Sequence, residues 1–228
     1  MPRDTLDRQM KQIEDEMLLL SSMVEQATFD SVTALRNRDY VAAKRVITED
    51  QAINEKRYAI ENAILIAMAT QQPFAHDLRL LAAMLLVTNE LERMGDYAKG
   101  IAHNNIRLGV TDVPIPIMDI EKMAELATSM LHRAMTAFVN EDARTAYDIP
   151  KEDDAVDALF NKSYKMIINS MITNPAVIDH ANIILWIIHN LERLADRVTN
   201  ICERTVFIAT GELLEMDSSL DEAEDELD

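Results

Sequence analysis

Apolar residues recur at alternating spacings of three and four along nearly the whole chain, which is the pattern of amphipathic α-helices. Prolines interrupt this pattern at Pro73, Pro114, Pro116 and Pro175, because a proline has no backbone N–H to donate and clashes with the preceding helical turn. The pattern therefore predicts six long helices, over residues 5–37, 40–70, 75–107, 118–140, 142–172 and 176–211. The fifth of these contains Pro150 in its first part.

The helical pattern is used twice. The first helix of each half ends at a similar polar turn, Asn37-Arg38-Asp39 and Asn140-Glu141-Asp142, and the two turns lie 103 residues apart. Later the offset becomes 100, where Leu91–Asp96 lies over Leu191–Asp196. Such a repeat predicts an all-α fold of two tandem, similar antiparallel three-helix bundles, in which each helix buries one apolar stripe against the other two. A single continuous layer of six helices is the alternative.

The repeat and the helix breakers also predict the domain boundaries. The first bundle covers residues 1–109 and the second covers 117–212, and the linker between them is 110–116. Residues 213–228 form an acidic tail that we predict to be disordered, because nine acidic residues and no basic one lie within 212–228.

The composition narrows the classes of protein that fit. The chain has 228 residues, 48% of them hydrophobic, with only 4 Gly and 5% aromatic residues, which favours helices over sheet. A single cysteine, Cys202, excludes a disulfide framework and a cysteine zinc site. A net charge of −18 argues against a nucleic-acid partner. The most apolar run, Ile183–Ile188, is too short for direct membrane insertion, so we expect a cytoplasmic protein.

Two pairs of carboxylates occupy equivalent places in the repeat. Glu92 and Asp96 lie one turn apart on the third predicted helix, about 120–160° around the helix from its apolar seam. Glu192 and Asp196 take the same place on the sixth. Carboxylates at this spacing repel each other by a few tenths of a kcal/mol, so a site that holds them together is a candidate for a bound cation.

The second helix of each half offers a partner pair at the same spacing. These pairs are Asp50 with Asn54 and Asp153 with Asp157. If the two helices are antiparallel, four oxygen-bearing side chains converge on one surface patch, and such ligands suit Mg²⁺, Mn²⁺ or iron rather than a closed structural zinc site. The alternative is a solvated acidic face, and duplication at a fixed offset gives the metal interpretation equal weight with it. The neutral amide of Asn54 is the weaker ligand.

These segments resemble a known family. Glu92–Ala98, Glu192–Asp196 and the turn Gln71–Arg79 are similar to the signature of the PhoU family, in the family's order. The resemblance implies two similar three-helix bundles whose carboxylate motifs bind divalent or trivalent metal ions, namely iron, manganese, magnesium or zinc, singly or in clusters. The implied ligands are Glu92, Asp96, Glu192, Asp196, Asp153, Asp157 and Asp50, and also Asn54, which departs from the acidic pattern.

The resemblance also implies a function. PhoU-like proteins are accessory regulators that act with an ABC phosphate transporter, here through its ATPase subunit, and with a phosphate-sensing histidine kinase. The implied role is negative regulation of phosphate-regulon signalling and of phosphate transport, through contacts at the inner face of the plasma membrane and without catalysis. A homodimer formed through helix faces is a further expectation.

Two other functions fit the residues. The first is a metal-dependent helical oxidoreductase and the second is a purely structural helical adaptor. His189 lies three residues before Glu192, the reverse of the Glu-x-x-His order of di-iron helices, so we expect it to be a boundary residue rather than a ligand. We expect Glu203, farther along the same stripe, to be solvated.

Overall fold

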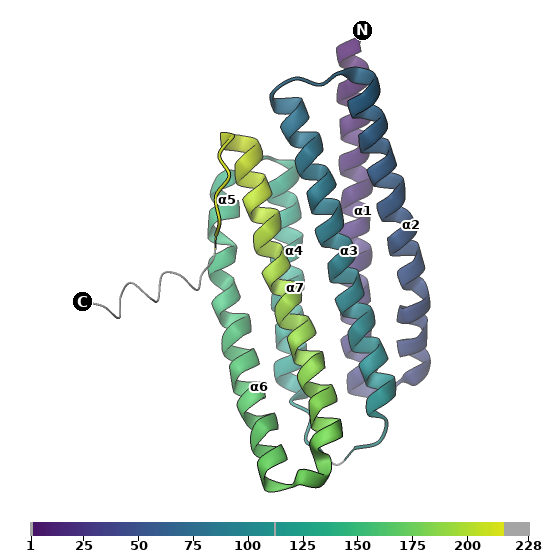
Figure 1. Cartoon of the computed structure of the whole chain (residues 1–228), viewed down its shortest axis with the longest axis vertical. Coiled ribbons are helices and arrows are strands. Elements are labelled where there is room, and N and C mark those ends of the chain that lie inside the picture. The colour runs from purple at the N-terminus through teal and green to yellow at the C-terminus, as the bar shows by residue number, and fades with distance from the viewer. Residues whose placement is uncertain (1, 112, 217–228) are drawn as a thin grey trace, which may run out of the picture.

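The structure is a computed structural model that describes residues 2–111 and 113–216, and it consists of long helices that run roughly along one axis (Figure 1). Within these residues there is no strand. The all-α prediction is therefore confirmed. The six long helices are α1 (Pro2–Asn37), α2 (Tyr40–Gln71), α3 (His76–Leu108), α4 (Ile117–Val139), α6 (Asp153–Thr173) and α7 (Ile178–Thr210). The short elements are α5 (Ala143–Asp148), η1 (Pro150–Glu152) and η2 (Pro175–Val177).

The prediction of one continuous helix over 142–172 is wrong. The segment is divided into α5, η1 and α6, and the division falls at Pro150, which begins η1. Proline has no N–H for the carbonyl four residues earlier, and its ring crowds that carbonyl, so α5 ends at Asp148. A new helix starts at Asp153. The break places the Asp153 side chain, a predicted ligand, in the first turn of α6.

The repeated polar turns are repeated in three dimensions. Arg38 and Glu141 both adopt positive φ, at 52° and 51°, and each reverses the chain after the first long helix of its half. The next residue then caps the following helix: Asp39 accepts hydrogen bonds from two backbone amides of α2, each at 2.9 Å, and Asp142 accepts one from α5 at 3.2 Å. This shared geometry explains why the two turns end in the same residue.

Replacing the cap of α2 should weaken the fold modestly. We expect Asp39→Ala to lower the free energy of unfolding by about 1 kcal/mol, because two amides of the first turn lose their acceptor. Urea unfolding measures this change. Asp39→Asn is the control, because an asparagine at the same position keeps an acceptor oxygen, and it should lie close to the wild type. An alanine variant as stable as the asparagine variant would contradict the cap's role.

The helices form two three-helix bundles that share one core. Helices α1, α2 and α3 pack on one another, as do α4, α6 and α7, which confirms the tandem bundles. In addition α3 packs along α7, and α1 along α4, so that four helices lie between the outer helices α2 and α6 (Figure 1). Most buried apolar side chains of both halves belong to one continuous cluster, and a small second cluster of Ala34, Ala43, Val46 and Ala102 lies within the first half. The predicted domain boundaries, including the linker at 110–116, stay predictions.

The apolar seams that the sequence predicts are the core. The seam residues of α3 and α7 are all buried, with at most 6% of the surface of any of them exposed: Leu80, Met84, Val87, Leu91, Met94, Ala98 and Ile101 in α3, and Ile184, Ile187, Leu191, Leu194, Val198 and Ile201 in α7. Cys202 is buried beside them. None of the described helices combines the length and the apolar character that a membrane crossing requires.

The segment after α7 is hydrogen-bonded to Glu203, a residue that was expected to be solvated. The backbone N–H of Met216 donates to Glu203 Oε1 at 2.9 Å, and the Glu203 side chain is only 14% exposed. The expectation that Glu203 is solvated is therefore wrong, because the segment after α7 covers it. The rest of the predicted acidic tail, 217–228, lies outside the described residues.

Candidate metal sites

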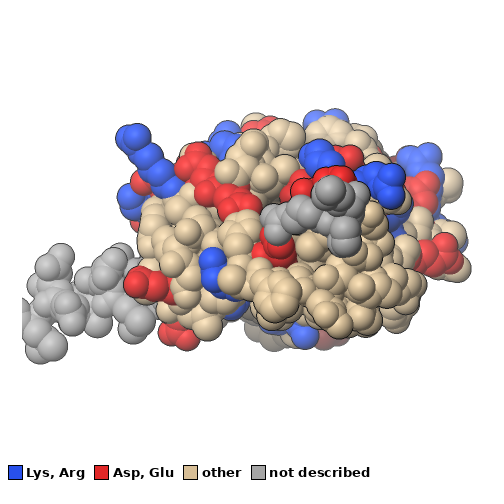
Figure 2. Space-filling view, turned by 90° about the horizontal axis from the view of Figure 1, so that it is seen from above, with Lys and Arg blue, Asp and Glu red and all other residues tan. Residues whose placement is uncertain are grey.

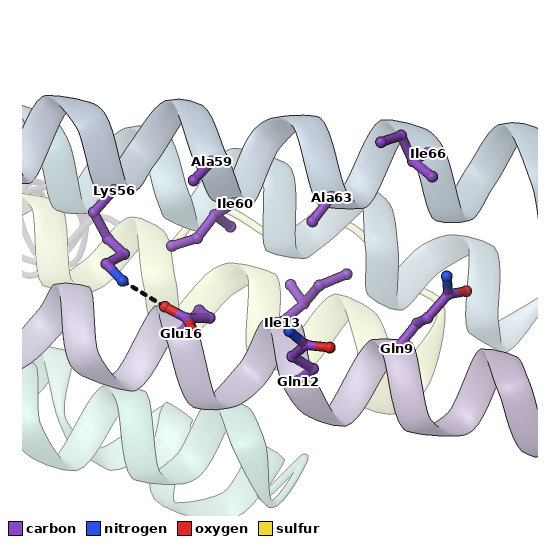
Figure 3. Close-up of a pocket in the computed structure, with 9 residues that line it drawn as sticks. All are labelled: Gln9, Gln12, Ile13, Glu16, Lys56, Ala59, Ile60, Ala63 and Ile66. Atoms are coloured by element: carbon purple, nitrogen blue, oxygen red, sulfur yellow. Dashed lines mark hydrogen bonds and ion pairs between the residues drawn. The ribbon is translucent and has the colours of Figure 1, made fainter.

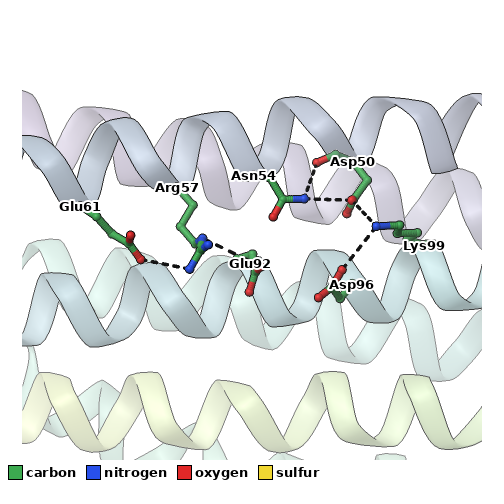
Figure 4. Close-up of polar contacts among 7 residues, drawn as sticks. All are labelled: Asp50, Asn54, Arg57, Glu61, Glu92, Asp96 and Lys99. Carbon is green, nitrogen blue, oxygen red and sulfur yellow. Dashed lines mark hydrogen bonds and ion pairs between the residues drawn. The ribbon is translucent and has the colours of Figure 1, made fainter.

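The four predicted ligands of the first half lie on the facing sides of α2 and α3 (Figure 4). Asp50 and Asn54 come from α2, and Glu92 and Asp96 come from α3. Their exposure differs: the side chain of Asp50 is 6% exposed and that of Glu92 is 16% exposed, whereas that of Asp96 is 52% exposed. The acidic pairs thus point away from the apolar seams, as predicted, but they sit partly inside the groove between two helices rather than on an open face.

A lysine already occupies this cluster. Lys99 Nζ lies 2.6 Å from Asp50 Oδ2 and 3.7 Å from Asp96 Oδ1, so it joins a carboxylate of α2 to one of α3. The side-chain amide of Asn54 donates to the same oxygen of Asp50 at 3.0 Å. The hydrogen bond to Asp50 raises the pKa of Lys99, which keeps the ammonium charged.

An arginine provides a second positive charge. Arg57 Nη1 lies 3.3 Å from Glu61 Oε1, and Arg57 Nε lies 3.9 Å from Glu92 Oε1 (Figure 4). Burial raises the pKa of Glu92, and the charge of Arg57 works in the opposite direction. Asp50 Oδ1 is buried without a hydrogen-bond partner among the described residues, as an oxygen of the second half also is, but the two cations already balance much of the negative charge of the first half. A metal ion therefore fits this cluster poorly as it stands.

The second half brings four carboxylates together between α6 and α7. Asp153 is 6% exposed, and its Oδ1 is buried without a hydrogen-bond partner among the described residues. Burial, together with the charges of Asp196 and Asp157, raises the pKa of Asp153 to about 7. Burial and the charge of Asp196 likewise raise the pKa of Glu192 to about 7. Buried acids that repel one another gain most from a cation, so this cluster fits a metal ion chemically.

The two clusters differ at three equivalent positions. The offsets of 103 and 100 residues place Asp157 where the first half has Asn54, Phe160 where it has Arg57, and Thr199 where it has Lys99. The second half thus has one more carboxylate and neither of the two cations at these positions. Only the first of these differences, Asn54 against Asp157, entered the predicted ligand sets.

A histidine that we did not expect to be a ligand lies against the second cluster. His189 Nδ1 is 3.0 Å from Glu192 Oε2, and the side chain is 40% exposed. Burial and the charge of Arg193 lower the pKa of His189, which favours the neutral ring. The i, i+3 spacing to Glu192 was the signal for this contact, because residues so spaced share a helix face. The neutral ring adds a nitrogen donor to the oxygen atoms of the site.

The described residues contain no ready-made metal site in which three or more His, Cys, Asp or Glu side chains are already drawn around one point. The ligand assignments and the metal therefore stay predictions. The second cluster fits a metal ion better than the first cluster does.

One surface groove between α1 and α2 includes the predicted ligand Asp50 in its lining, whereas another includes none of the predicted ligands. The latter groove, also between α1 and α2, is lined largely by apolar and amide side chains, with one ion pair of 2.6 Å between Lys56 and Glu16 (Figure 3). Seen from the end of the bundles, acidic and basic side chains are interspersed among uncharged ones (Figure 2). The face seen in Figure 2 is therefore not the single-sign surface that binding to a phosphate backbone requires.

The architecture defines a class: duplicated all-α proteins in which each half is a three-helix bundle with acidic side chains at an equivalent place. The family model of the PhoU domain matches residues 17–104 and 120–205, and the chain belongs to the PhoU family.

Curated relatives and solved structures agree with this family. A Streptococcus pneumoniae protein named a homolog of the phosphate-specific transport system accessory protein PhoU is 33% identical over 94% of this chain and 99% of its own length. The Escherichia coli accessory protein PhoU is 30% identical over 90% of this chain and 85% of its own. The crystal structure of the phosphate transport system regulatory protein PhoU from Streptococcus pneumoniae superposes with a TM-score of 0.85 at 31% identity, and covers 92% of this chain and 100% of the other.

Proposed function

We propose that this protein is an accessory regulator of a phosphate transport system and acts by protein–protein contact rather than by catalysis. Its relatives are named accessory or regulatory proteins of phosphate transport, and they match almost their full length. The proposed role is negative regulation of phosphate uptake and of phosphate-regulon signalling in the cytoplasm. The proposed partners are the ATPase subunit of an ABC phosphate transporter and a phosphate-sensing histidine kinase. These names favour a regulator over the oxidoreductase alternative.

One observation supports a metal-dependent mode of contact: four carboxylates gather between α6 and α7, among them Asp153, whose Oδ1 is buried without a hydrogen-bond partner among the described residues. The ligands would be Asp153, Asp157, Glu192 and Asp196, and the metal would be iron, manganese, magnesium or zinc. A bound cation supplies positive charge that compensates the carboxylates and holds α6 and α7 in one register. The partner would then meet a fixed surface rather than four repelling acids.

Capture of the partner tests this proposal. We expect the wild-type chain with Mn²⁺ to capture the ATPase subunit or the kinase from solubilised membranes of phosphate-replete cells. The double variant Asp153→Asn, Asp196→Asn should capture at least fivefold less, as should the wild type with a chelator. Asp179→Asn is the matched control, because this exposed acid lies on α7 about 20 Å from the cluster. Equal capture by all the chains would favour the purely structural adaptor, in which the acids serve only solvation.

A further inference from the structure

The first-half cluster contains its own cation between carboxylates that were predicted to hold a metal ion. We infer that Lys99 substitutes for a metal ion in the first half, so that only the second of the two duplicated carboxylate clusters is open to metal. The comparison between the two clusters rests on the metal site of the second half under the proposed function. The claim about the first half can be tested by itself.

The position of Lys99 is the first support. Its Nζ connects the buried carboxylate of Asp50 on α2 with that of Asp96 on α3, at 2.6 and 3.7 Å (Figure 4). This is the connection between two helices that a shared metal ion would otherwise make. The lysine side chain is 32% exposed, so most of it lies within the groove. Asp50 Oδ1 is buried without a hydrogen-bond partner among the described residues, but a metal ion at that oxygen would lie close to the ammonium held by Oδ2 of the same carboxylate.

The neighbours of Lys99 give the second support. The side-chain amide nitrogen of Asn54 donates to Asp50 Oδ2 at 3.0 Å and to the Asp50 backbone oxygen at 3.1 Å, so that Asp50 Oδ2 already accepts from both Asn54 and Lys99. The guanidinium of Arg57 lies between Glu61 and Glu92. An entering divalent ion would meet two fixed positive charges close by, and like charges repel strongly where water is partly excluded.

The second half supplies the internal comparison. Phe160 and Thr199 stand at the positions of Arg57 and Lys99, and neither carries a charge. The guanidinium of Arg193 is turned toward α3, where it lies 5.3 Å from the centre of the Tyr97 ring. All three differences between the halves favour a cation in the second cluster over the first. At each of these positions the first half has a hydrogen-bond donor or a cation, and the second half has an acid or an uncharged residue.

Mn²⁺ binding to a chain without the second-half site tests the first half alone. In the Asp153→Asn, Asp196→Asn background, we expect no Mn²⁺ binding by calorimetry at micromolar to submillimolar concentration. Adding Asn54→Asp and Lys99→Thr copies the second-half residues, and this opened variant should bind Mn²⁺ at least tenfold more tightly than the background chain does. Mn²⁺ should also raise the unfolding temperature of this opened variant and leave that of the background unchanged. If the background chain binds Mn²⁺ and loses it on Asp50→Asn, the inference is overturned.

A milder variant keeps the test decisive if the opened variant does not fold. Lys99→Gln removes the charge but retains a hydrogen-bond donor, and it too should tighten Mn²⁺ binding in that background. No gain in a folded Lys99→Gln chain, as judged by circular dichroism, would count against the inference.

The reciprocal exchange separates the two claims. In the otherwise wild-type chain, Thr199→Lys should weaken Mn²⁺ binding at least tenfold, whereas Thr199→Met, of similar length but uncharged, should weaken it far less. Equal effects of the two would show that bulk, not charge, closes the cluster, and would overturn the role given to Lys99. If the wild type binds no Mn²⁺ at all, the metal site of the proposed function fails, while the comparison in the first half still decides the role of Lys99.

Discussion

Asp153→Asn should stabilise the metal-free chain at pH 8 by about 2–4 kcal/mol, although it removes a proposed ligand. Burial and neighbouring acids raise the pKa of Asp153 from 3.8 to about 7 in the folded chain. The folded state therefore binds a proton between about pH 4 and pH 7 that the unfolded state has released. Stability falls as the pH rises through this window, and the full penalty is present above pH 7. Asparagine carries no charge and avoids the penalty.

Urea unfolding of both chains in the presence of a chelator, at pH 8 and again at pH 4, measures this effect. The advantage of the variant should be lost at pH 4, where Asp153 is protonated in the folded chain. The equivalent change in the first half, Asp50→Asn, is the matched control and should have the opposite sign, because Lys99 then loses its buried partner. Equal losses of stability in both variants at pH 8 would show that the two clusters are not chemically different.

Leu191→Ala should destabilise the whole molecule by about 3 kcal/mol, because it leaves a cavity in the core. Leu191 is fully buried on α7, a helix that packs on α3 as well as on α4 and α6. Because the core is continuous across the halves, the variant should still unfold in a single transition, observed by circular dichroism in urea.

The same substitution at an exposed leucine provides the control. Leu65 on α2 is 54% exposed, and Leu65→Ala should change the free energy of unfolding by about 0.5 kcal/mol or less. Two separate transitions in the Leu191→Ala chain, one for each half, would contradict the shared core.

The periodicity of apolar residues predicted most of the fold, because the burial of apolar side chains decides which face of each helix packs against the others. The seams of α3 and α7 could be identified residue by residue from spacings of three and four, and they are buried as expected. The break at Pro150 was missed, because an apolar period continues through the segment and hides a local steric conflict. The packing of α3 along α7 was also missed, since the pattern of one helix does not say which distant helix covers it.

The candidate sites were predicted in part. Spacing along one helix placed Glu92 beside Asp96 correctly, but it said nothing about groups arriving from the opposite helix. Lys99, three residues after Asp96, looks like an ordinary surface partner until Asp50 is seen beside it. Comparing the halves position by position would have exposed the exchange of Lys99 for Thr199, which was the signal available in the sequence.

The continuous core has a consequence for synthesis on the ribosome. The N-terminal half emerges first, and the apolar flanks of α1 and α3 remain uncovered until α4 and α7 have left the exit tunnel. Docking of the first three helices onto the second three must therefore wait until the second half has been synthesised. During that interval the uncovered apolar side chains of the nascent chain are exposed to chaperones and to neighbouring nascent chains.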